Sequence, residues 1–94
     1  MEAKIFEVDA TLEVSGVKVF TSHSANDCKI VFTQSALTND GWKQNCKTWN
    51  ISKDVHADLT TKINETISHD VLDVHMYDIV KLMQEKGLDP FVKA

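Results

Sequence analysis

The pair of residues best spaced for metal chemistry is His69 and Asp73, which lie four positions apart in the C-terminal half of the chain. On a helix, this spacing places an imidazole and a carboxylate on one face, where both could ligate the same ion. Two ligands do not make a site, and His75 lies about 120° around the helix from His69. A weak polar pair on a helix surface is therefore the favoured interpretation, with a small metal-dependent hydrolase as an alternative.

Nucleophilic catalysis would need one of the two cysteines beside a basic side chain. Cys46 with His56, or Cys28 with His23, would meet this need if the fold brought them together. No nucleophile elbow surrounds either thiol, and a free cysteine is commonly a small buried hydrophobe. The sequence therefore predicts a protein that is not an enzyme, with no catalytic residues, no metal ligands and no cofactor.

Two tryptophans, Trp42 and Trp49, flank the least regular stretch of the sequence and are candidates for a contact surface. Exposed aromatic residues are typical of binding hot spots, although a tryptophan is more often packed in the core. Residues 43–53 hold three lysines and no acid, so stacking of single-stranded nucleic acid is an alternative function. The net charge of -4 argues against it, because neutralising phosphates supplies most nonspecific affinity.

Carboxylates are frequent in the C-terminal half and form a second candidate contact surface. The members singled out are Asp54, Asp58, Asp70 and Asp73. Such a surface could imitate nucleic acid phosphates, but solvation of the outer faces of amphipathic helices is the favoured interpretation. By elimination, the sequence predicts a small protein-binding module, a regulator or inhibitor, whose protein partner is not identified and which could form a homodimer.

Bulk composition narrows the class of protein. The chain has 94 residues, 43% of them hydrophobic and 26% charged, as expected of one globular domain over residues 1–94. All ten basic residues are lysine, which disfavours bidentate recognition of phosphate or guanine and fits the AT-rich coding genomes of many bacteriophages. The sequence has neither a signal peptide nor an apolar run of the roughly 20 residues that span a membrane, so we expect a cytoplasmic protein.

A β-hairpin is predicted at the start of the chain. Apolar and polar residues alternate over residues 6–14, the period of a strand with one buried face. Ser15 and Gly16 then form a two-residue loop that sets Val14 opposite Val17. In this register apolar side chains meet on one face and opposite charges meet on the other.

Two further strands are expected. The third covers residues 28–34, and residues 39–41, Asn-Asp-Gly, have the chemistry of a three-residue hairpin loop. They lead to a fourth, irregular strand within residues 42–51. In the resulting register Cys46 faces Gln34 and lies too far from the other cysteine for a disulfide.

Helices are predicted for the rest of the chain. Ser52 can cap a helix over residues 53–68, and a second helix ends near Gly87. The alternation within residues 70–77 leaves a strand as an alternative there. Each predicted helix has an apolar stripe along one face. The stripe is Val55, Leu59, Ile63 and Ile67 in the first helix, and Leu72, Met76, Ile79, Val80 and Met83 in the second. The predicted fold is α+β, an antiparallel meander of three to four strands with two helices packed on one face (ββββαα).

Overall fold

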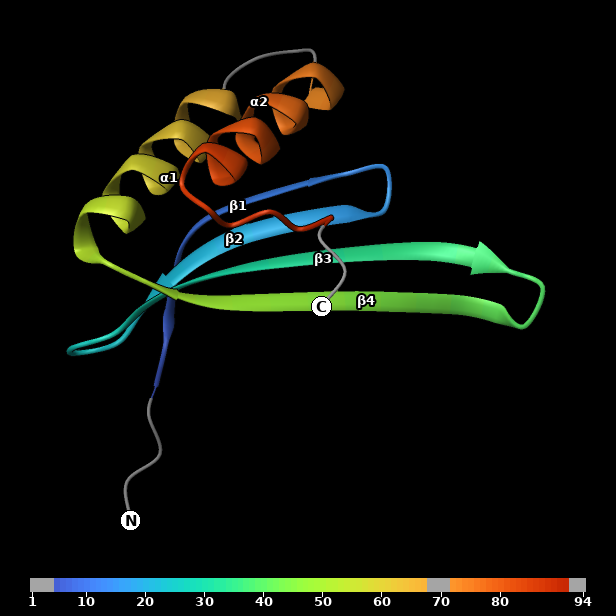
Figure 1. The fold of residues 1–94 in the computed structure, drawn as a ribbon, viewed down its shortest axis with the longest axis horizontal. Helices are drawn as coiled ribbons and strands as arrows, with labels where there is room; N and C mark the ends of the chain where they lie inside the picture. The colour runs from blue at the N-terminus through green and yellow to red at the C-terminus, as the bar shows by residue number, and fades with distance from the viewer. Residues whose placement is uncertain (1–4, 68–71, 92–94) are drawn as a thin grey trace.

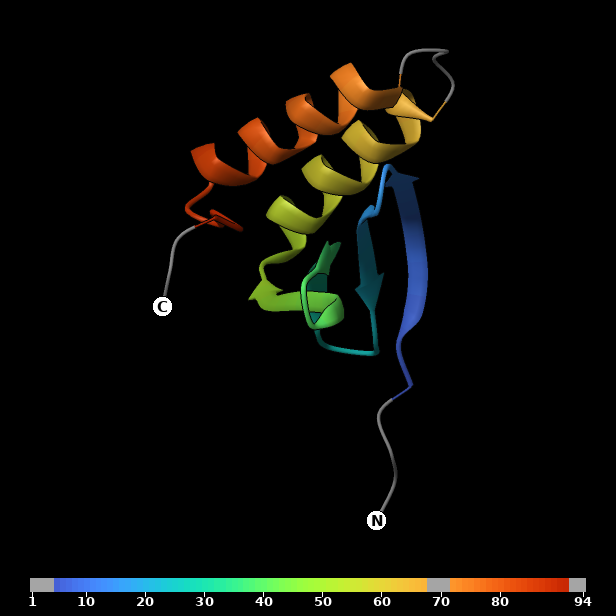
Figure 2. The same ribbon diagram turned by 90° about the vertical axis from the view of Figure 1, so that its right-hand side faces the viewer.

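The computed structural model describes residues 5–67 and 72–91, and it has the predicted ββββαα order. One antiparallel sheet has the strand order β1-β2-β3-β4, and both helices lie on the same side of it (Figures 1 and 2). The elements are β1 (Glu7–Val14), β2 (Val17–His23), β3 (Cys28–Thr38), β4 (Gly41–Ile51), α1 (Lys53–Thr66) and α2 (Leu72–Glu85). In the part of the chain described, neither helix has the length and apolar character needed to cross a bilayer.

The hydrophobic core lies between the sheet and the two helices. Burying such side chains is the main favourable term in folding, at roughly 25 cal/mol per Å² of apolar surface. Its members include Leu12, Val19, Ile30 and Phe32 from the sheet and Leu59, Ile63, Ile79 and Met83 from the helices. The core therefore fixes α1 firmly over the first three strands.

The β1–β2 hairpin has the predicted register. Val14 pairs with Val17 and Leu12 with Val19, so the loop is the two residues Ser15 and Gly16. Both loop residues have positive φ, 50° and 79°, as a type I′ turn requires.

The β3–β4 hairpin differs from the prediction by one residue. Thr38 pairs with Gly41, whose φ is 102°, so Gly41 begins β4 and the loop holds two residues instead of three. The shorter loop shifts the register, and Cys46 lies opposite Thr33 instead of Gln34. Both cysteines are free thiols, as predicted.

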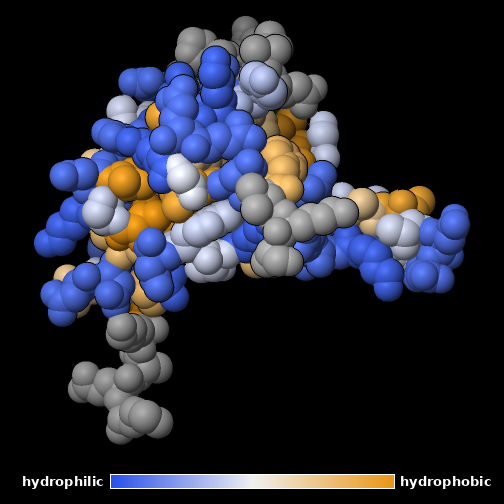
Figure 3. Space-filling view, in the orientation of Figure 1, coloured by the Kyte–Doolittle hydropathy of each residue, from blue (hydrophilic) through white to orange (hydrophobic). Residues whose placement is uncertain are grey.

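The β3–β4 hairpin also extends beyond the rest of the sheet. The last β3 residue paired with β2 is Gln34, opposite Val17, so residues 35–44 form a two-stranded projection that we call the β3–β4 arm. The arm projects clearly from the body of the molecule and carries apolar residues near its end (Figure 3). Leu37 and Trp42 are cross-strand partners there, with 68% and 72% of their surfaces exposed.

The helix boundaries agree with the caps read from the sequence. Ser52 Oγ accepts a hydrogen bond of 3.2 Å from the N–H of Val55 at the start of α1. At the end of α2, Gly87 has a φ of 80° and the N–H of Leu88 donates to the carbonyl of Met83, the Schellman arrangement. Since α2 is helical from Leu72, the strand alternative is wrong from that residue onward, and residues 70 and 71 lie outside the described residues.

Candidate metal centre

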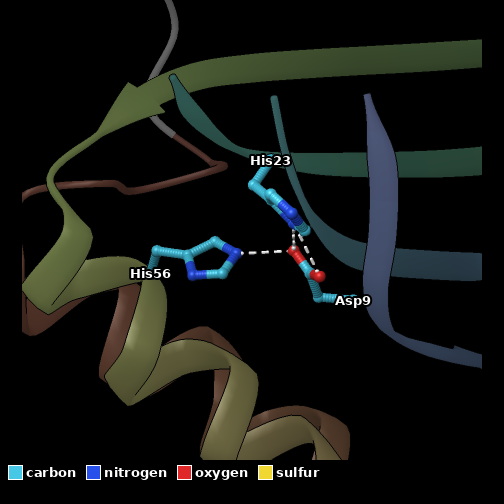
Figure 4. Close-up of side chains that lie close together, drawn as sticks. All are labelled: Asp9, His23 and His56. Atoms are coloured by element: carbon cyan, nitrogen blue, oxygen red, sulfur yellow. Dashed lines mark hydrogen bonds and ion pairs between the residues drawn. The ribbon is translucent and has the colours of Figure 1, made fainter. Parts of the chain in front are cut away.

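Three side chains from three different elements converge at the end of the sheet where β1 begins. They are Asp9 of β1, His23 at the end of β2 and His56 near the start of α1, and we call them the Asp9 cluster (Figure 4). Each offers one ligand atom, and these atoms all lie within 4.8 Å of one another. Among the residues described, this is the one group of three or more such side chains close enough to hold a metal ion.

A β-bulge aims Asp9 into the cluster. Val8 pairs with Ser22 and Ala10 with Thr21, so Asp9 is an extra residue without a partner on β2. The bulge changes the phase of the strand: the Asp9 side chain is only 21% exposed, whereas Val8 is 59% exposed. The prediction that apolar residues fill one buried face throughout residues 6–14 is therefore wrong before Ala10.

Ordinary strand and helix periodicities bring the two histidines to Asp9. Thr21 and His23 are two apart on β2 and share the face beneath α1, while His56 and Thr60 are four apart and share one face of α1. The hydroxyl groups of Thr21 and Thr60 lie 2.8 Å apart in a hydrogen bond. This contact holds α1 against β2. His23 and His56 lie one repeat of the strand and one turn of the helix away from the threonines, toward the end of the sheet, and meet there.

The carboxylate of Asp9 stands between the two imidazoles. His23 Nδ1 lies 2.8 Å from both carboxylate oxygens, and His56 Nε2 lies 2.8 Å from Oδ2. The two rings are 6.1 Å apart between centroids and inclined by 74°. The carboxylate of Glu7 lies farther out, 3.8 Å from His23 Nε2.

These contacts shift the pKa values of two members of the cluster. Burial alone would raise the pKa of Asp9, but hydrogen bonds from His23 and His56, together with their charges, outweigh it and lower that pKa. The hydrogen bond to Asp9 raises the pKa of His23, against a smaller opposing effect of desolvation, and the charges of Asp9 and Glu7 add to the rise. Asp9 is therefore ionised at neutral pH, the state in which a carboxylate ligates metals.

The donor set and its spacing suit a small divalent ion. Zinc binds imidazole nitrogen and carboxylate oxygen at about 2.0 to 2.2 Å, which places tetrahedral donors about 3.4 Å apart. The donor atoms of the cluster already lie within 4.8 Å, and the 2.8 Å contacts need to lengthen only slightly when an ion replaces the bonding protons. Two imidazoles and one carboxylate are ligands of Zn²⁺ and of neighbouring transition metals.

A hollow of about 380 Å³ adjoins the cluster. All three members of the cluster line it, together with residues 24–27 of the β2–β3 turn, Cys28 and Lys53. An ion held by the cluster would therefore lie at the wall of a space large enough for a small molecule.

The structure separates the two tryptophans singled out in the sequence. Trp42 is exposed on the arm, whereas Trp49 is half-buried and packs against the core opposite Ile30. Because side chains alternate along a strand, Trp42 lies on the face of β4 opposite to that of Lys43 and Lys47. Trp49 shares the face of Lys43 and Lys47 but packs against the core, so the exposed tryptophan and the two lysines lie on opposite faces.

The structure describes only some of the acidic residues proposed as a contact surface. Asp54 and Asp58 are exposed on α1, and Asp58 Oδ2 lies 2.8 Å from Lys86 Nζ in an ion pair. His69 and Asp70 lie outside the described residues, and only the helical backbone is described at Asp73. The suggested pairing of His69 with Asp73 therefore stays a prediction.

Of the two suggested thiol and imidazole pairs, only one is brought together. Cys28 is the direct cross-strand partner of His23, and both line the hollow. Cys46 is exposed on the face of the sheet away from the helices, where Thr33 Oγ1 donates to its Sγ over 3.7 Å, so it does not meet His56. Asp9 was not singled out in the sequence, because its place in a regular alternation gave no sign of the bulge.

Fold and site together define a small α+β domain with a candidate metal centre of two histidines and one aspartate. Comparisons with family models, with curated proteins and with solved structures find no match to this chain. Its function must therefore be inferred from its own geometry.

Proposed function

We propose that this protein binds one divalent transition metal ion, with zinc as the best fit, through Asp9, His23 and His56. The observation that carries the proposal is the convergence of three donor atoms within 4.8 Å from three separate elements. Such a site does not form until β1, β2 and α1 have packed, so the ion would stabilise the folded chain over the unfolded one.

The arrangement of the cluster favours a metal over a simple hydrogen-bond network. Nitrogens of both His23 and His56 lie 2.8 Å from the same carboxylate oxygen, Asp9 Oδ2, so two imidazoles from different elements converge on one point. A single divalent ion can replace the two bonding protons and bind all three donors at once. The bulge that turns Asp9 toward the helices has a purpose in this account, since bulges often aim a side chain next to a functional site.

Zinc titration of the purified, metal-free protein tests the proposal. We expect one ion per chain by calorimetry and a rise in melting temperature with zinc concentration, since zinc at 100 times Kd adds about 2.7 kcal/mol of stability. His56→Ala should abolish both effects, and His69→Ala is the matched control that should retain them. Equal zinc binding by His56→Ala, or its loss in His69→Ala, would contradict the assignment.

A second function, contact with another protein through the β3–β4 arm, is favoured by the pairing of Leu37 with Trp42. These apolar side chains are more than two-thirds exposed, and exposed aromatic residues are typical of hot spots. The partner that fits this pair is a protein surface with an apolar pocket.

A comparison of variants tests the contact function separately from the metal. A protein captured by the wild type should be lost with the double variant Leu37→Ser and Trp42→Ser, and should be retained by His56→Ala. Ile67→Ser is the control, because Ile67 is an exposed apolar residue, 50% exposed, at the far end of α1. Capture that survives the double variant would remove this second function, and self-association lost in that variant would identify the partner as a second copy.

A further inference from the structure

We propose that the ion in this centre keeps a coordination position open toward the adjacent hollow, and that this position takes the anionic group of a small molecule, a carboxylate or a phosphate. This inference rests on the proposed metal function and identifies the class of ligand that the same site would accept.

Three protein ligands leave one coordination position of a zinc ion to be filled by another group. Zinc is almost always four-coordinate, and sites with three protein ligands complete the set with water or substrate. Asp9, His23 and His56 all line the same hollow, so their fourth partner must come from that side. The volume of the hollow, about 380 Å³, falls within the range of small-molecule sites, roughly 300 to 1,000 Å³.

The charged residues around the hollow determine whether it attracts an anion. The described residues that line it include two carboxylates, Asp9 and Asp27, and one ammonium group, Lys53. With both imidazoles neutral, as metal ligation requires, a bound divalent ion brings the formal charge of these groups and the ion together to positive by one. The hollow should therefore attract anions when the ion is bound.

Lys53 gives the site a cation that is independent of the metal. It is the first residue of α1, three positions before His56, and it lines the hollow beside the cluster. A flexible, solvated ammonium group is suited to pairing with a carboxylate or phosphate as a point charge.

The competing arrangement is closure of the fourth position by Cys28. This thiol is the cross-strand partner of His23 and lines the same hollow. Its sulfur, however, is not among the ligand atoms that lie within 4.8 Å of one another. Three protein donors are already gathered, and the space beside them remains open to solvent molecules and small ligands.

Cobalt substitution makes the coordination visible, because the visible absorption of Co²⁺ reports its ligands. We would load the protein with Co²⁺ and titrate it with inorganic phosphate and, separately, with acetate. The spectrum should change saturably with at least one of these probes, and calorimetry on the metal-free protein should detect no binding of either. Lys53→Met should weaken anion binding about fivefold, the equivalent of 1 kcal/mol for an exposed charge pair, and Lys62→Met on the same helix should not.

The outcomes separate this inference from the function on which it rests. Absence of any Co²⁺ binding would overturn both. Co²⁺ binding with a spectrum insensitive to both anions would overturn the open position alone, and a thiolate-to-cobalt charge-transfer band lost in Cys28→Ser would identify the group that closes it. Equal anion binding by the metal-free protein would contradict the role given to the ion.

Discussion

The two ends of the β3–β4 ladder differ in what covers them, and they offer different chemistry as a result. Where β3 begins, α1 packs over the sheet and polar side chains converge in the half-buried Asp9 cluster. At the far end, residues 35–44 project without a helix above them, and Leu37 and Trp42 are exposed. Partial burial strengthens electrostatic interactions in the cluster, whereas the uncovered arm leaves its apolar surface available for contact.

A matched pair of leucine substitutions should give the largest contrast between these regions. Leu59→Ala removes a fully buried side chain of α1 and should lower the free energy of unfolding by about 2 to 5 kcal/mol. Leu37→Ala on the arm should change it by no more than about 0.5 kcal/mol. Urea denaturation of both variants measures the difference, and comparable losses would show that the arm is part of the stabilising core.

Removing a ligand should have the next largest effect, on zinc affinity. Asp9→Ala should weaken zinc binding by at least about 100-fold, since losing even an outer partner of a ligand typically costs 10- to 100-fold. Trp42→Ala, at the other end of the ladder, should leave the affinity unchanged. Competition with a chromophoric chelator measures the zinc affinity of both variants. If Trp42→Ala lowered the affinity as much as Asp9→Ala, the claim that only the Asp9 end of the sheet binds the metal would be wrong.

The stability of the metal-free protein should vary with pH because of the pair formed by Asp9 and His23. The pKa of Asp9 is lowered by folding, so its contribution is present above its unfolded pKa of about 4 and is lost as pH falls through the lower folded value. The pKa of His23 is raised, so its contribution is present below about pH 6.5 and is lost as pH rises through the higher folded value.

The combined contribution should therefore be greatest between about pH 4 and pH 6.5. The difference in stability between the wild type and Asp9→Asn, measured by urea denaturation from pH 3 to pH 9, isolates this contribution from those of other titrating groups. A difference that stays constant from pH 3 to pH 9 would show that the pair does not couple to folding.

The smallest effect is expected from Trp42. Trp42→Ala should change the free energy of unfolding by no more than about 0.5 kcal/mol, because the side chain is 72% exposed. It should also remove the longer-wavelength part of the fluorescence emission and leave the signal of the half-buried Trp49. A large loss of stability, or emission unchanged in shape, would mean that Trp42 is covered.

Much of the fold is predictable because its signals are local. The hairpin register follows from the alternation around Ser15 and Gly16, the start of α1 from the capping side chain of Ser52, and the end of α2 from Gly87. Each depends on residues within a few positions of the feature. The β3–β4 register was predicted wrongly because Gly41, expected in the loop, begins β4, and the length of the loop determines which residues pair.

The Asp9 cluster was missed because nothing local marks it. His23 is 14 positions from Asp9 and His56 is 47, so only the packing of α1 on the first two strands joins them. The bulge that exposes Val8 and turns Asp9 inward interrupts a sequence that alternates regularly on both sides of it. A bulge without glycine or proline leaves no compositional sign.

The most direct test of the account is zinc titration of the ¹⁵N-labelled protein, followed through its amide NMR spectrum. We predict saturable shifts at one equivalent of zinc, greatest around Asp9, His23 and His56, with the amides of residues 35–44 unmoved. Shifts centred on residues 69–73, or on the arm, would place the metal elsewhere. A spectrum unchanged by zinc would contradict the central claim that this end of the sheet is a metal centre.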